Sequence, residues 1–314
     1  MNNISRPTRR AVLGAAAGLS VLLAVTACSG SNPLSSSSSG SASGGPVVVG
    51  SANFPENAII AEIYAGALNA AGVTATTKLN IGAREVYIKA IQDGSVDVVP
   101  DYSGNLLGFV DPSNTVTDPA GVLAALPAKL PSGLTVLAAS SAEDKDAMVV
   151  TAETAAKYGG LKSITDLAKV CDQLTLGAPP EFKTRPYGLP GLAKIYNCVP
   201  KAFTPISDGG GPLTVKALLN NEIQVADIFT TSPDIPANNL VVLEDPLHNW
   251  LAQQVLPLVK ADRINDKATA ALNNVSKVLT TQDLISLRNQ VEGTQKMDPK
   301  AAAAAWLKDK GITK

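Results

Sequence analysis

Residues 47–105 read VVVGSANFPENAIIAEIYAGALNAAGVTATTKLNIGAREVYIKAIQDGSVDVVPDYSGN, in which short apolar runs alternate with amphipathic stretches. Three strands and three helices are expected here in turn, at 47–50, 55–71, 75–79, 84–93, 96–99 and 103–109. Pro55 suits the first turn of its helix, because backbone N–H groups in the first turn have no partner within the helix and proline lacks this group. Strands that alternate with helices predict an α/β fold with parallel-rich sheets and helices on both faces.

The same alternation returns later in the chain. Further elements are expected at 174–178 and 225–229 as strands, and at 186–196 and 213–220 as helices. Ser163, followed three residues later by Asp166, is typical of a capped helix start. From Asp266 to Lys314 the pattern is helical, with breaks near Thr280 and Asp298, and we expect this tail to serve packing rather than function.

The first 28 residues have the organisation of a bacterial lipoprotein signal. Arg6, Arg9 and Arg10 precede a short apolar run, 11–27, which ends in small residues before Cys28. Such a segment is removed rather than folded, and Cys28 would then carry the lipid. A permanent transmembrane helix is the weaker interpretation, because the run is shorter than the roughly 20 residues that span a bilayer. The arginine pair also loosely matches a twin-arginine signal, which leaves the export route open.

These features predict an extracytoplasmic protein, anchored by lipid to the outer face of the cell membrane. Residues 29–45, SGSNPLSSSSSGSASGG, are expected to form a flexible tether because they contain almost nothing apolar to bury. A folded body begins at Pro46. Loss of the three arginines of the signal changes the formal net charge from −1 to −4, and a body of that sign is poorly suited to nucleic acid.

The three cysteines divide between two roles. Cys28 is expected to carry lipid, which leaves Cys171 and Cys198 as an even pair in an oxidising compartment. We predict a disulfide between them. Two buried free thiols are the alternative.

Catalytic motifs are sparse in this chain. His248 is the only histidine, and neither Cys-x-x-Cys nor His-Glu-x-x-His occurs, so no metal site is expected. The glycines at 209–211 lack the Gly-Lys-Ser/Thr of a phosphate loop, and no Gly-x-Ser-x-Gly elbow is present. We therefore expect a binding protein without cofactor rather than an enzyme, with a hydrolase built around His248 as an alternative.

Five segments of the body carry a family resemblance, namely GSANFPENAIIAEIYAGAL (50–68), LNIGAREVYIKAIQDGSVDVVPDYSGN (79–105), GAPPEFKTRPYGLPGL (177–192), VKALLNNEIQVADIFTT (215–231) and LEDPLHNW (243–250). In order and coverage they resemble the substrate-binding proteins of osmoprotectant ABC importers, which take up glycine betaine, choline and carnitine. The resemblance implies a two-lobed periplasmic-binding-protein fold of type II character, joined by two crossover hinge strands. Lobe 1 would comprise 46–146 and 240–314, and lobe 2 would comprise 147–239.

The resemblance also implies the mode of action. The two lobes would close around the ligand without chemistry. A monomer of this kind would deliver its solute to an ABC permease and the associated ATPase. Family members hold the quaternary ammonium group in a cage of tyrosines through cation–π contacts. They hold the ligand's carboxylate with basic and hydroxyl groups.

Some positions match this pattern. Tyr102 corresponds to the first cage tyrosine, and Arg185 corresponds to the carboxylate-binding arginine. Asn53 belongs to the family's Gly-Ser-Lys-Asn-Phe start, in which Ala52 replaces the lysine here. Arg185 could alternatively form a salt bridge within its own lobe.

Other positions depart from the pattern. Asp146, Phe229 and Gln253 align with the remaining cage tyrosines, and Asn105 aligns with a carboxylate-contacting threonine. Asp146 could neutralise a cation and so favour choline-like ligands over zwitterionic betaine, or it could pair with Arg185 across the cleft. The pocket could also suit a neutral polyol or a hydroxylated aromatic molecule. A sensor lipoprotein with no transport role remains a further alternative.

Overall fold

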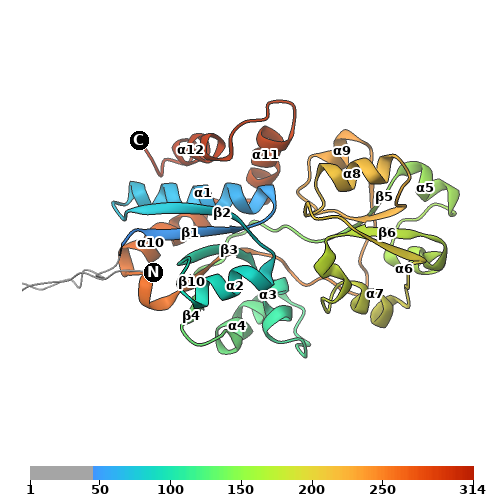
Figure 1. The fold of residues 1–314 in the computed structure, drawn as a ribbon, viewed down its shortest axis with the longest axis horizontal. Helices are drawn as coiled ribbons and strands as arrows, with labels where there is room; N and C mark the ends of the chain where they lie inside the picture. The colour runs from blue at the N-terminus through green and yellow to red at the C-terminus, as the bar shows by residue number, and fades with distance from the viewer. Residues whose placement is uncertain (1–44) are drawn as a thin grey trace, which may run out of the picture. The chain divides into compact units, whose positions relative to one another are not determined.

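The computed structural model of the 314-residue chain describes residues 45–314 (Figure 1). The predicted signal segment 1–28, with Cys28, and residues 29–44 of the predicted tether lie outside the described residues. Within 45–314 no helix is long and apolar enough to cross a membrane. The described residues build two five-stranded sheets, each packed against helices (Figure 1).

The first sheet has the strand order β2-β1-β3-β10-β4. Its strands are β1 (Val47–Ala52), β2 (Ala75–Gly82), β3 (Val98–Tyr102), β4 (Leu134–Val136) and β10 (Val255–Lys260). β1 runs parallel to β2 and β3, whereas β10 runs antiparallel to β3 and β4. The sheet is therefore mixed rather than wholly parallel, because β10 returns to it from the second sheet instead of following a crossover helix.

The second sheet repeats this arrangement with the order β7-β6-β8-β5-β9. Its strands are β5 (Met148–Val150), β6 (Thr175–Ala178), β7 (Ala202–Pro205), β8 (Val225–Asp227) and β9 (Val241–Val242). β6 runs parallel to β7 and β8, and β5 runs antiparallel to β8 and β9. The predicted strand at 225–229 ends at Asp227, so Phe229 lies beyond the strand rather than at its end.

The chain passes between the two sheets twice, over residues 137–147 and 243–254 (Figure 1). The two segments meet at a single antiparallel bridge between Glu143 and Gln254. Near it, the backbone N–H of Val255 donates to the carbonyl of Ala142 at an N···O distance of 3.0 Å, which is typical of a sheet. These are the two predicted crossovers, although each is mostly loop.

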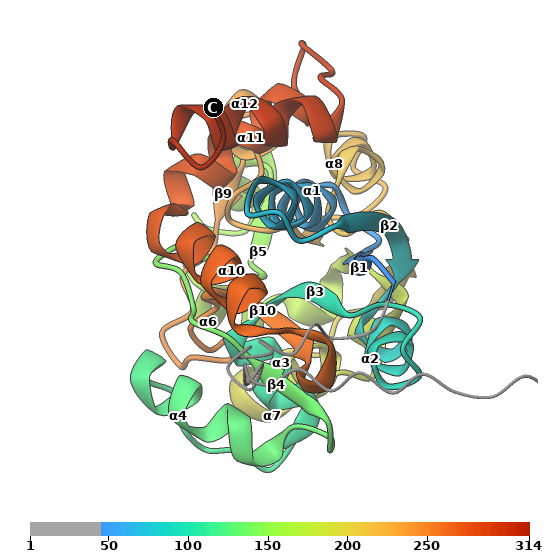
Figure 2. The same cartoon turned by 90° about the vertical axis from the view of Figure 1, so that its left-hand side faces the viewer.

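Helices cover both faces of the first sheet (Figure 2). One face carries α1 (Pro55–Ala70), α10 (Asp266–Val278), α11 (Thr281–Glu292) and α12 (Pro299–Asp309), and the other carries α2 (Arg84–Gln92), α3 (Ser103–Val110) and α4 (Pro119–Lys129). Side chains of β10 alternate between the two cores, with Val255 and Val259 in one and Leu256 and Leu258 in the other. This period of two, with both faces apolar, marks a central strand.

Shorter helices surround the second sheet in the same way. They are α5 (Ala152–Lys157), α6 (Ile164–Ala168), α7 (Leu189–Tyr196), α8 (Pro212–Leu219) and α9 (Asp234–Ala237), together with the 3₁₀ turns η1 (Cys171–Gln173) and η2 (Pro180–Lys183). A third 3₁₀ turn, η3 (Ala261–Arg263), follows β10 of the first sheet. Ser163 caps α6, as predicted, by accepting a hydrogen bond from the N–H of Asp166. Met148 and Val150 pack in one core of this sheet and Val149 packs in the other.

Helix α1 is enclosed between the first sheet and the three C-terminal helices (Figure 2). Ile59, Ile63 and Tyr64 are buried, as expected for a helix that is apolar on nearly all sides. A Cβ atom on Gly66 would lie 2.4 Å from Cδ1 of Leu307, so glycine is what lets α12 approach this closely. The tail therefore completes the core of the first sheet.

The two predicted breaks in the tail are helix starts. Thr280 accepts a hydrogen bond from the N–H of Asp283, and the Asp283 carboxylate accepts one from the N–H of Thr280, which completes a capping box. Asp298 caps α12 by accepting from two backbone N–H groups. Both breaks are thus fixed by side chains that satisfy otherwise unpaired donors.

Cys171 and Cys198 are joined by a disulfide in the second sheet's core, with a Cα–Cα distance of 5.4 Å. Both residues are buried and pack against Leu174 and Leu192. The bond connects η1 to the residues after α7 across a sequence separation of 27. It therefore restrains one edge of the region that bears Arg185.

Replacing both cysteines by alanine should lower the free energy of unfolding by about 3 kcal/mol, because the unfolded chain regains the freedom of the closed loop. Urea denaturation of the two proteins measures the difference. A reducing agent should destabilise the wild-type protein by a similar amount and leave the double variant unchanged. Equal stability of both proteins under oxidising conditions would contradict the prediction.

Candidate ligand-binding site

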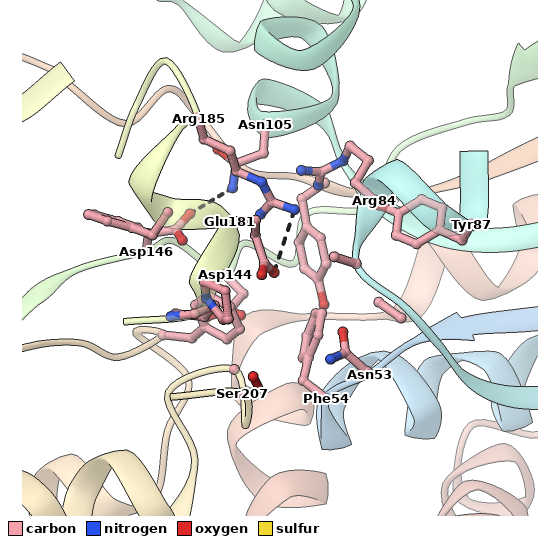
Figure 3. Close-up of a pocket in the computed structure, with 18 residues that line it drawn as sticks. Asn53, Phe54, Arg84, Tyr87, Asn105, Asp144, Asp146, Glu181, Arg185 and Ser207 are labelled. Carbon is pink, nitrogen blue, oxygen red and sulfur yellow. Dashed lines mark hydrogen bonds and ion pairs between the residues drawn. The ribbon is translucent and has the colours of Figure 1, made fainter. Parts of the chain in front are cut away.

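A pocket opens where loops from both sheets meet (Figure 3). Its walls come from the ends of β1, β3, β6 and β8, from the start of α2, and from the 137–147 segment. Ligands of α/β proteins commonly bind beyond the carboxyl ends of strands. Six of the predicted ligand-binding residues line this pocket: Asn53, Tyr102, Asn105, Asp146, Arg185 and Phe229.

Three aromatic rings form a contiguous row in the pocket. The ring centroids of Phe54 and Tyr102 are 6.0 Å apart, and those of Phe54 and Phe229 are 5.1 Å apart at an interplanar angle of 62°. Gly209 lies against Phe54 with a φ of +63°, and a Cβ atom there would be 2.7 Å from Cβ of Phe54. Only glycine fits this conformation and this space. Tyr102 ends a strand of the first sheet and Phe54 follows another, whereas Phe229 follows a strand of the second, so the row combines rings from both sheets.

Tyr102 is held in place by a buried carboxylate. Its hydroxyl donates to Oε1 of Glu56 at 2.7 Å, and the hydroxyl of Thr231 donates to Oε2 of Glu56 at 2.5 Å. Nη1 of Arg288, in α11, donates to the same Thr231 oxygen at 3.0 Å. Burial and the charge of Glu56 raise the pKa of Tyr102 well above its usual range. The tyrosine is therefore neutral, and its ring faces the pocket in a fixed orientation.

Asp146 and Asn105 form a second polar group in the wall (Figure 3). Nδ2 of Asn105 donates to Oδ2 of Asp146 at 2.6 Å. Gln253 does not line the pocket. It is completely buried behind Asn105, donates to its side-chain oxygen at 2.6 Å and accepts from its backbone N–H at 2.9 Å. Its contribution in this structure is to orient Asn105.

Further carboxyl groups surround the aromatic row. Asp144 lines the pocket, and its Oδ1 accepts from the N–H of Thr231 at 3.1 Å. Burial and the nearby Glu56 raise the pKa of Asp144 well above its usual range. Burial and the charge of Asp146 do the same to the pKa of Asp227, whose Oδ1 has no hydrogen-bond partner among the described residues. The wall thus carries Asp144 and Asp146, with the buried Asp227 close to Asp146, and a cation in the pocket would favour the ionised forms of such groups.

Each nitrogen of the Arg185 guanidinium donates to a protein group. Its Nε and Nη2 donate to the two carboxylate oxygens of Glu85 at 3.2 and 3.1 Å, and its Nη1 donates to the hydroxyl of Tyr187 at 2.8 Å. Glu181 lies 3.7 Å from Nη2. Asp146 bonds Asn105 instead, so the predicted alternative of an Asp146–Arg185 pair is not formed. Glu85 lies on the first sheet's helix α2, so the main ion pair of Arg185 joins elements of the two sheets rather than lying within one lobe.

Arg84 is a second guanidinium in the wall, and sequence reasoning missed it. Its Nη2 forms a buried ion pair with Oδ1 of Asp101 at 2.7 Å, and its Nη1 donates weakly to Tyr187 at 3.5 Å. The hydroxyl of Tyr87 donates to the same aspartate at 2.8 Å. The positive charge of Arg84 is therefore neutralised inside the protein by Asp101, and this ion pair offsets the cost of burying the guanidinium.

Sequence reasoning also missed Phe54, Asp144 and Glu181. Phe54 follows Asn53 directly within a segment that carries the family resemblance, and that position was the available signal. His248 is exposed and does not line the pocket. Within the described part of the chain no cluster of three or more histidine, cysteine or acidic residues could hold a metal ion.

Comparisons with known proteins identify relatives of this chain. The chain is 28% identical to the glycine betaine-binding protein YehZ of Escherichia coli over 282 residues, which cover 86% of this chain and 92% of YehZ. It is 25% identical to the carnitine transport binding protein OpuCC of Listeria monocytogenes, covering 73% and 74% of the two chains. A crystal structure described as a glycine betaine/carnitine/choline ABC transporter shares the fold, with a TM-score of 0.66 at 22% identity and coverage of 85% and 99%.

The family profile for the substrate binding domain of ABC-type glycine betaine transport systems matches residues 45–309, which include both sheets and the pocket between their loops. The chain belongs to this family of substrate-binding domains of ABC-type glycine betaine transport systems.

Proposed function

We propose that this substrate-binding component captures a small quaternary ammonium solute in the pocket and delivers it to the permease of an ABC importer. The observation that supports this most directly is the row of three aromatic rings beside a group of carboxyl side chains. A quaternary ammonium group has no N–H to donate, so aromatic faces and negative charge are the means by which a protein can hold it.

The ring faces of Phe54, Tyr102 and Phe229 would each contribute about 0.5 to 2 kcal/mol of cation–π attraction. Asp144 and Asp146 would add direct charge attraction. Both arginines of the wall are already paired within the protein, which leaves little to attract a ligand's carboxylate. Within the glycine betaine, choline and carnitine class, we therefore favour a choline-like cation.

We propose clamp closure as the mechanism. The first sheet and its helices, 46–146 and 240–314, would form one lobe, and the second sheet with its helices, 147–239, would form the other. Contacts such as Glu85–Arg185 and Glu56–Thr231 link the two in this arrangement. We further propose that the protein acts as a monomer, anchored to the outer face of the cell membrane through lipid on Cys28, with an ABC permease and its ATPase as partners.

Calorimetric titration of the purified protein with choline should show saturable binding. Phe229→Leu should weaken it about tenfold, because leucine keeps the volume but removes one aromatic face. Phe229→Tyr, which keeps the face, should bind like the wild type. Heat only from polyols or hydroxylated aromatic compounds would show that the ligand is of another class, and equal affinities of the leucine and tyrosine variants would show that the ring is not a cation contact.

Choline binding should strengthen as the pH rises. The pKa values of Asp144 and Asp227 are raised by burial and by neighbouring acids, so both groups hold their protons to a higher pH than an ordinary aspartate does. A bound cation favours the ionised forms, so binding should release protons and weaken as pH falls. Titrations in buffers of different ionisation enthalpy measure this release. Asp144→Asn should reduce it, whereas a release unchanged in that variant would exclude Asp144 as the source.

A further inference from the structure

We propose that Glu85 sets the charge class of the ligand. Its carboxylate occupies Arg185, a guanidinium of the pocket wall that could otherwise bind a ligand's carboxylate, so that the pocket accepts cations and rejects zwitterions. This inference rests on the proposed function, because it concerns which members of the quaternary ammonium class the same pocket holds.

The geometry of the pair supports this role. Two N–H groups of Arg185 meet the two oxygens of Glu85 in parallel, at 3.2 and 3.1 Å, in the bidentate arrangement that guanidinium and carboxylate groups favour. The remaining Nη1 donates to Tyr187 at 2.8 Å. The Nε–Nη2 edge of this guanidinium is therefore already bonded to Glu85, and a ligand's carboxylate could bind there only by displacing it.

The fold fixes Glu85 in this position. It is the second residue of α2. The first residue, Arg84, is held by a buried ion pair with Asp101, which fixes the start of the helix. The hydroxyl of Tyr187 accepts from Arg84 at 3.5 Å and from Arg185 at 2.8 Å, so it connects the two guanidinium groups. Glu85 thus reaches Arg185 from helix α2 of the first sheet, whereas Arg185 belongs to the second.

The pair is ionised and accessible to competition. Although its partial burial opposes ionisation, hydrogen bonding to Arg185 and the charge of that residue lower the pKa of Glu85. The Glu85 side chain is 43% exposed and that of Arg185 is 16% exposed. The carboxylate of a zwitterion would have to displace Glu85 from Arg185. The Glu85 carboxylate would then be left without its cation. A simple cation leaves the pair intact.

Substitution of Glu85 tests the proposal with two probes, choline and glycine betaine, titrated into the purified full-length protein. The wild type should prefer choline. In Glu85→Ala, glycine betaine should bind about 10- to 100-fold more tightly than it does to the wild type, the range expected for a hydrogen-bonded ion pair gained by the ligand. Glu85→Gln, which keeps the shape, should shift the preference in the same direction.

Two controls separate this role from a general change of charge. Glu181→Gln removes one negative charge near Arg185 but leaves the bidentate pair, so the ratio of the two affinities should change by less than about threefold. Adding Arg185→Ala to Glu85→Ala should abolish the gain for glycine betaine. An equal shift in Glu181→Gln would overturn the proposal.

The outcomes also distinguish this inference from the proposed function. A wild type that binds choline, together with Glu85 variants that gain nothing for glycine betaine, would overturn the role of Glu85 alone. A wild type that binds glycine betaine as tightly as choline would do the same. A wild type that binds no quaternary ammonium compound would overturn both.

Discussion

The carboxylate of Glu56 accepts hydrogen bonds from two hydroxyl groups that belong to different halves of the protein. Tyr102 ends a strand of the first sheet, whereas Thr231 follows the last parallel strand of the second. A buried carboxylate is costly unless it is hydrogen-bonded, so Glu56 favours the arrangement in which both hydroxyls reach it. The orientation of the Tyr102 ring in the pocket wall and the approach of the two sheets are thereby fixed by the same group.

Charge balance around the pocket follows from this arrangement. Arg84, Arg185 and Arg288 each have an acidic partner within the protein, at Asp101, Glu85 and Glu292 respectively. Asp144 and Asp146, beside the aromatic row, form no ion pair within residues 45–314. This imbalance between paired bases and unpaired acids supports the proposal of a cationic ligand.

Local patterns predicted the elements between 47 and 109 and the capped helix starts at Ser163 and Thr280, because periodic apolar runs and caps leave short-range signals. The short strands β4, β5, β7 and β9 leave too brief a pattern and were not predicted. Pairings over a long sequence separation leave none. Glu85 and Arg185 are 100 residues apart, and nothing in the spacing indicates that they meet. The site residues came from the family resemblance for the same reason, and the antiparallel strand β10 gave no sign of its direction before the structure placed it between β3 and β4.

The interleaved path of the chain also governs the order in which it can fold. The second sheet is built from one continuous stretch, 148–242, and can assemble as soon as that stretch has been synthesised. The first sheet cannot, because its strand β10 and the helices that enclose α1 follow the whole of the second sheet in the chain. Its early strands, β1 to β4, therefore keep exposed edges until residues 255–309 have been synthesised, and we expect them to be the part most prone to aggregation during synthesis.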